Sequence, residues 1–159
     1  MSNQKISVLL KIIIIIMALL GLGAYGVVVP WSLSTFVEQY PEFGYYYTPW
    51  LIFILITAIP LYAILAFGWS VSAEMKKDML FTKKNAKSLR LVAVLLGGDA
   101  VFFFVGNIVF WLFNLNFPGV VIAAFFFSLF VVLISAAVAI LASMIDKACV
   151  IREENESII

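Results

Sequence analysis

One acidic residue, Asp99, lies in the middle of a long apolar stretch of this 159-residue chain. It follows Arg90 by nine residues, or about 13 Å of helix, so a membrane helix that starts near Arg90 places it close to the bilayer midplane. A carboxyl group there costs about 2.5–3.5 kcal/mol on insertion scales and by default marks a functional position. Two chemistries fit it: binding or moving a proton or ion, and hydrogen bonding between helices.

Polar side chains in neighbouring stretches lie at a similar depth. Counting inward from the same side of the membrane reaches Tyr62 and Ser135. We expect Asp99, as a neutral carboxylic acid, to hydrogen-bond Ser135, Tyr62 or both, because the apolar stretches offer no Lys, Arg or His as a partner. Asn107 falls on broadly the same helix face as Asp99. The sequence therefore predicts an intramembrane polar site of Asp99, Asn107, Ser135 and Tyr62.

Several classes of chemistry are disfavoured by what the chain lacks. It has no histidine and a single cysteine, Cys149, which disfavours a metal site and excludes an intrachain disulfide. Intramembrane aspartyl proteolysis needs two carboxyl groups that share a proton, and the apolar stretches contain one. There is no nucleotide-binding motif and no basic domain large enough to bind nucleic acid directly. We therefore expect no enzyme, no cofactor and no metal.

The composition indicates a protein of the lipid bilayer and an all-helical fold class. Hydrophobic residues make up 65% of the chain and charged residues 12%, whereas soluble domains are about half apolar and a quarter charged. Four apolar runs, at about 12–29, 50–69, 91–113 and 120–145, are long enough to span a bilayer, which takes about 20 residues (range about 17–25). Only helices satisfy the backbone of such runs in lipid. The predicted fold is all-α: one antiparallel bundle of four transmembrane helices over residues 1–159, with a short tail at 146–159.

The basic residues predict the orientation. None lies in segments 30–49 and 114–119, whereas the opposite side of the membrane holds Lys5, Lys11, Lys76, Lys77, Lys83, Lys84, Lys87, Arg90, Lys147 and Arg152. The positive-inside rule makes that side cytoplasmic, with both termini on it. The other boundary carries tryptophan and tyrosine, which is typical of an outer interface.

The polar segment 70–90 joins the second and third runs. We expect the second helix to run on to about Met79 and the third to begin after Phe81, with Thr82 capping its first N–H groups. The lysines of this segment fit a topology determinant that touches anionic lipid, or a docking surface for a cytoplasmic protein. The sequence leaves both interpretations open.

Two short stretches resemble a known family. Residues 79–90, MLFTKKNAKSLR, are similar to its pattern pFt-x-x-N-x-x-x-L-R, and residues 151–159, IREENESII, are similar to its tail L-K-E-E-N-D-L-T-I/V. With four helices in this order, the chain resembles the YoaS-like bacterial membrane proteins, a family named only as a domain of unknown function. It departs from the pattern at Lys83–Lys84, where an acidic step is common, and at Ser157–Ile158.

The resemblance implies a bacterial plasma-membrane protein, of a kind often encoded beside a small Cro-like helix-turn-helix regulator. Carried over to this chain, it makes two segments candidate partner-binding surfaces, namely Phe81, Thr82 and Asn85 in the inner loop and Glu153, Glu154 and Asn155 in the tail.

Three functions are compatible with these features. The leading one is a non-enzymatic regulator or anchor in the bacterial inner membrane that binds a cytoplasmic partner, such as a small helix-turn-helix regulator. The alternative is a small transporter or channel, with Asp99 on the pathway. A third is an immunity or stress protein that guards the bilayer. The lipid bilayer is the expected partner in each case, and assembly with further copies of the chain stays open.

Overall fold

The computed structural model describes residues 3–75 and 81–158, and these residues are almost entirely helical. In chain order the elements are α1 (Asn3–Gly23), the π-helical turn η1 (Ala24–Val28), α2 (Val29–Gln39), the 3₁₀ helix η2 (Pro41–Tyr46), α3 (Tyr47–Met75), α4 (Lys83–Leu112) and α5 (Pro118–Ser157). Within the described residues, four helical segments are long and apolar enough to cross a membrane: Gln4–Gln39, Pro41–Met75, Lys83–Leu112 and Pro118–Ser157. The all-helical fold with four such helices is confirmed.

The first helix does not end at Pro30, although the sequence places the end of the apolar run there. α1, η1 and α2 follow one another without a break from Asn3 to Gln39. Pro30 lies in the first turn of α2, directly after the wider turn η1. Because proline clashes with the carbonyl four residues earlier in a regular helix, a wider turn at that point makes room for it.

The helices also extend beyond the apolar runs, because an apolar run marks only the part of a helix that lies in hydrocarbon. α5 has 40 residues, or about 60 Å, and continues to Ser157 through the segment that the sequence sets apart as a tail. Thr82 caps α4 as expected, since its Oγ1 accepts a hydrogen bond from the Asn85 N–H at 3.2 Å. The expected continuation to Met79, with Lys76 and Lys77, lies outside the described residues.

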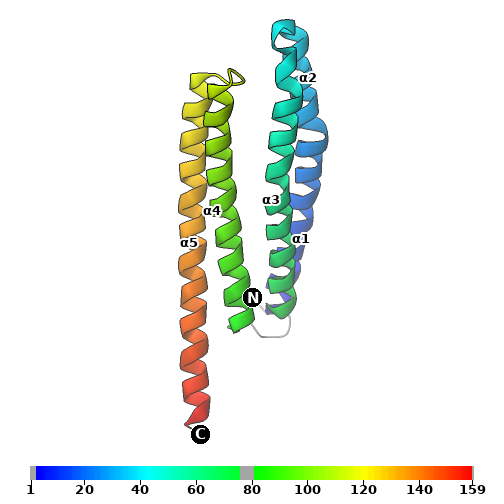
Figure 1. Cartoon of the computed structure of the whole chain (residues 1–159). Helices are drawn as coiled ribbons and strands as arrows, with labels where there is room; N and C mark the ends of the chain where they lie inside the picture. Colours follow the sequence, from blue (N-terminus) through cyan, green and yellow to red (C-terminus); the bar gives the residue numbers. More distant parts are fainter. Residues whose placement is uncertain (1–2, 76–80, 159) are drawn as a thin grey trace.

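The helices form an open row. In the part of the chain that the structure describes, α1 and α2 pack against α3, α3 packs against α4, and α4 packs against α5. Figure 1 shows two hairpins side by side, one of α1, α2 and α3 and one of α4 and α5. Both termini lie at the end where α4 begins, which we call the basic end (Figure 1). The α4–α5 turn and η2 lie at the opposite end, which we call the aromatic end.

Small side chains recur every seventh residue along the α4–α5 interface. The buried series on α4 is Ala86, Ala93, Ala100 and Asn107, and the series on α5 is Ser128, Ser135, Ala142 and Cys149, buried except for the half-buried Ser135. A strict seven-residue repeat keeps one seam of each helix on its partner. Small residues on that seam let the two backbones approach closely, which is how membrane helices gain packing energy.

Two serines of this seam differ in their hydrogen bonding and give a matched test. Ser135 Oγ donates to the Ala93 carbonyl at 2.6 Å, whereas the buried Ser128 Oγ has no hydrogen-bond partner among the described residues. We expect Ser135→Ala to lower the free energy of unfolding by about 1 kcal/mol. Ser128→Ala should leave it unchanged or raise it, because an unpaired buried hydroxyl is removed. Unfolding in detergent micelles measures both, and equal losses would contradict the assignment.

The first hairpin is held by hydroxyl groups that reach across to the partner backbone. Ser7 Oγ donates to the Ser72 carbonyl at 2.7 Å, and Ser72 Oγ donates to the Ser7 carbonyl at 2.9 Å. Both serines are buried at the basic end. Nearer the middle, the Tyr62 hydroxyl donates to the Ala18 carbonyl at 2.8 Å, beside Gly21.

The two hairpins meet where the Phe53 ring of α3 covers Gly106 of α4. A Cβ atom built on Gly106 would lie 2.2 Å from Phe53 Cε2, so only glycine allows this approach. At the aromatic end, Trp50 Nε1 donates to the Leu115 carbonyl at 2.7 Å. The Tyr46 hydroxyl donates to the Asn114 carbonyl, also at 2.7 Å. These bonds join the first hairpin to the turn of the second.

Candidate functional site

Asp99 lies on the side of α4 that adjoins α3. It shares a helix face with Gly106, seven residues further on, which touches Phe53 of α3. Ser135 lies on the other side of α4. Its hydroxyl donates to the Ala93 carbonyl and lies against Gly97. At about 100° per residue, Gly97 is about 160° around the helix from Asp99. The expected hydrogen bond between Asp99 and Ser135 is therefore wrong.

The expected bond between Asp99 and Tyr62 is wrong as well. Tyr62 faces α1, and its hydroxyl donates to the Ala18 carbonyl there. In the described part of the chain, the half-exposed Asp99 has no hydrogen bond and no ion pair. Among the described residues no ion pair or hydrogen bond joins it to a second acid or base, so the arrangement shows no acid–base pair there.

Asn107 belongs to a separate network at the aromatic end. It is fully buried, and its Nδ2 donates to the Phe103 carbonyl at 2.8 Å. Asn116 Nδ2 donates to Asn107 Oδ1 at 2.9 Å, while Asn116 Oδ1 accepts from the Phe117 N–H at 2.8 Å. Asn107 thus fixes the α4–α5 turn. The sequence analysis missed Asn116, although an asparagine two residues before Pro118 is a typical signal of a helix start.

The four residues of the predicted intramembrane site therefore do not lie together. Tyr62 serves the α1–α3 interface, Ser135 the α4–α5 interface and Asn107 the turn at the aromatic end. Asp99 remains on the α3 side of α4.

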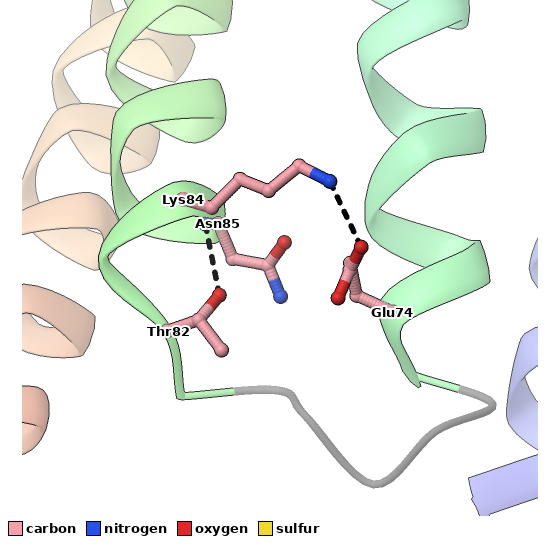
Figure 2. Close-up of polar contacts among 4 residues, drawn as sticks. All are labelled: Glu74, Thr82, Lys84 and Asn85. Atoms are coloured by element: carbon pink, nitrogen blue, oxygen red, sulfur yellow. Dashed lines mark hydrogen bonds and ion pairs between the residues drawn. The ribbon is translucent and has the colours of Figure 1, made fainter.

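At the basic end, an ion pair connects α3 to α4. Lys84 Nζ donates to Glu74 Oε1 at 2.9 Å, and Glu74 is the more buried of the two side chains. Figure 2 shows this pair beside the cap that Thr82 forms on Asn85. Asn85 is 2% exposed, so it supports the start of α4. Its predicted role as a partner-binding residue does not fit this conformation, because a buried amide offers no surface to a partner.

The segment before α4 meets the end of α5. Lys83 Nζ lies 2.9 Å from Glu153 Oε2, although the two residues are 70 positions apart in the chain. A pocket of about 270 Å³ opens beside this ion pair. We call its lining the loop–tail junction, which consists of Phe81, Thr82, Lys83, Cys149, Arg152, Glu153 and Glu156.

The junction combines an exposed aromatic ring with charges of both signs. Phe81 is 55% exposed and lines the pocket together with the charged side chains of Lys83, Arg152, Glu153 and Glu156. Arg152 Nε donates to Glu156 Oε1 at 2.9 Å across one helical turn. Glu154 and Asn155 are exposed but line other faces of α5. The structure thus brings together Phe81, Thr82 and Glu153 of the six predicted partner-binding residues.

Comparison with known proteins places most of the chain in one family. Residues 31–159 match the family model described as "Protein of unknown function (DUF2975)". The matched range contains both segments of the loop–tail junction and Asp99. No curated protein and no solved structure matches the chain.

Proposed function

Since the chain belongs to the DUF2975 family, whose function is unknown, we propose from its own structure that it is a non-enzymatic membrane regulator or anchor. It binds a cytoplasmic protein at the loop–tail junction. The two short motifs support a likeness to the YoaS-like proteins, and the partner class that this likeness implies is a small helix-turn-helix regulator.

The distribution of charge supports the orientation that this proposal needs. The lysines and arginines that the structure describes belong to the basic end of the row, and segments 30–49 and 114–119 carry none. By the positive-inside rule, the basic end with both termini faces the cytoplasm of a bacterial cell. The junction is then accessible to soluble proteins.

The junction itself is the observation that carries the proposal. Two segments far apart in the sequence form one pocket, and Phe81 stands exposed at its edge. A half-exposed aromatic anchor surrounded by charged groups is the usual composition of a protein-binding surface. The ion pair between Lys83 and Glu153 is itself solvent-exposed and contributes little to stability, which leaves both charges available to a partner.

Site-specific photo-crosslinking in native membranes tests the proposal. A crosslinker at Phe81 and, separately, at Glu156 should capture the same soluble protein, since both residues line the pocket. Glu154 is the control position, because it is also exposed on α5 but lies outside the pocket. Capture of lipid and of the chain itself at Phe81 and Glu156, with no soluble protein, would contradict the proposal.

A second candidate function is a small transporter or channel with Asp99 on its pathway. The observation that favours it is that Asp99, within an apolar helix, has no hydrogen-bond partner in the described residues. Intramembrane carboxyl groups of this kind commonly serve proton or ion pathways. Proton or cation flux into liposomes should then fall at least tenfold in Asp99→Asn. Flux that is indifferent to this change would exclude the pathway.

A further inference from the structure

A second cleft at the basic end lies between α4 and α5, next to the loop–tail junction, with which it shares Lys83. It is lined by Lys83, Ala86, Lys87, Arg90, Leu91, Val94 and Asp146. Three of these side chains are cations and one is an anion, so the lining carries a net positive charge.

The cations of the cleft keep their charges at the surface. Arg90 Nη2 is 3.7 Å from Asp146 Oδ2, a long contact in which the two side chains remain 59% and 45% exposed. Lys87 is exposed and has no ion pair in the described part of the chain. An exposed pair of this kind contributes little, so an incoming anion displaces it at small cost.

The part of the cleft that lies further along α4 is apolar. Leu91 and Val94 follow Arg90 at the start of the apolar run and are 40% and 66% exposed. Val94 lies about 6 Å further along α4 than Arg90. The cations therefore stand at headgroup level, and the apolar wall stands where acyl chains begin.

We infer that this cleft is a binding site for one anionic phospholipid. Lys87 and Arg90 hold the phosphate, with Lys83 at the rim, and an acyl chain lies along Leu91 and Val94. A guanidinium group and ammonium groups that line one cleft suit a phosphate, whose oxygens accept hydrogen bonds from them. The apolar wall distinguishes a lipid from a free phosphate, which gains nothing from Val94. The inference does not depend on the proposed protein partner.

Lipid titration of the purified full-length protein, followed by native mass spectrometry, tests this inference. Phosphatidylglycerol should bind in preference to phosphatidylcholine. Lys87→Gln with Arg90→Gln should weaken phosphatidylglycerol binding at least tenfold, since each basic residue at a membrane surface contributes about fivefold. The matched control is Lys5→Gln with Lys147→Gln, which removes the same charge at the same end but outside the cleft. It should change binding less than threefold.

Asp146→Asn separates a binding role from a structural one. If Arg90 serves only its ion pair with Asp146, this variant should weaken phosphatidylglycerol binding as the loss of Arg90 does. If Arg90 binds phosphate, removal of the competing carboxylate should strengthen phosphatidylglycerol binding severalfold. Weaker binding in Asp146→Asn, or equal weakening in the control double variant, would overturn the inference. Displacement of the lipid by glycerol phosphate alone would overturn it too, because it would identify a site for free phosphate esters.

Discussion

Replacement of Gly106 by alanine should destabilise the protein by about 1–3 kcal/mol, the usual cost of adding a methyl group to a filled core. The new Cβ would lie 2.2 Å from Phe53 Cε2. The ring has little freedom to move away, since Phe53 is 6% exposed and packs against four aromatic rings, those of Trp50, Phe102, Phe103 and Phe110. Thermal unfolding in detergent micelles measures the loss.

Gly98 is the matched control for this change. A Cβ built on Gly98 meets no atom within 4 Å, so Gly98→Ala adds a methyl group to the same helix without a clash. It should leave stability unchanged or raise it by up to about 1 kcal/mol through helix propensity. In a Phe53→Leu background the cost of Gly106→Ala should shrink, because the clashing ring is gone. A similar loss at Gly98 and Gly106 would contradict the close contact between the hairpins.

Asn116→Ala is expected to have the second large effect, a loss of about 1–3 kcal/mol. It removes the donor to Asn107 Oδ1 and the acceptor for the Phe117 N–H. Asn107 is fully buried and would keep an unsatisfied carbonyl oxygen, which is more costly than the loss of the bond itself. Thermal unfolding measures the loss, and amide hydrogen exchange should report faster exchange at Phe117.

Asn155→Ala is the control for the asparagine variant. Asn155 is exposed near the end of α5, so its replacement should change stability by less than about 0.5 kcal/mol. If Asn116→Ala changed stability as little as Asn155→Ala, the network at the aromatic end would not hold the α4–α5 turn.

The sequence predicts the number and type of the long helices because hydrophobicity and length are local properties. Three of the four apolar runs lie within the long helices and the third ends one residue past α4, and the cap at Thr82 depends on neighbouring residues alone. The end of the first apolar run at position 29, just before Pro30, does not mark the end of the helix. A wider turn a few residues earlier absorbs the proline, and the sequence gives no clear sign of that turn.

The partners of polar residues are harder to predict, because depth in the membrane does not determine direction around a helix. Asp99, Tyr62 and Ser135 are predicted at a similar depth, but Tyr62 faces α1 and Ser135 lies between α4 and α5. The seven-residue series of small residues on α4 and α5 could have indicated which side carries Ser135. No spacing rule links Lys83 to Glu153, 70 positions away, although opposite charges at the same membrane boundary are compatible with a pair.

The row of helices has a consequence for how the chain is made. Since contacts in the described residues run between successive helices, order in space follows order in synthesis. Each helix after the first finds the helix that it packs against already in the bilayer, and the first waits only for α3. Such low contact order favours fast assembly with few wrong pairings. The hydroxyl bonds of Ser7, Ser72 and Tyr62 are complete once α3 has entered, so the first hairpin can be stable before α4 and α5 exist.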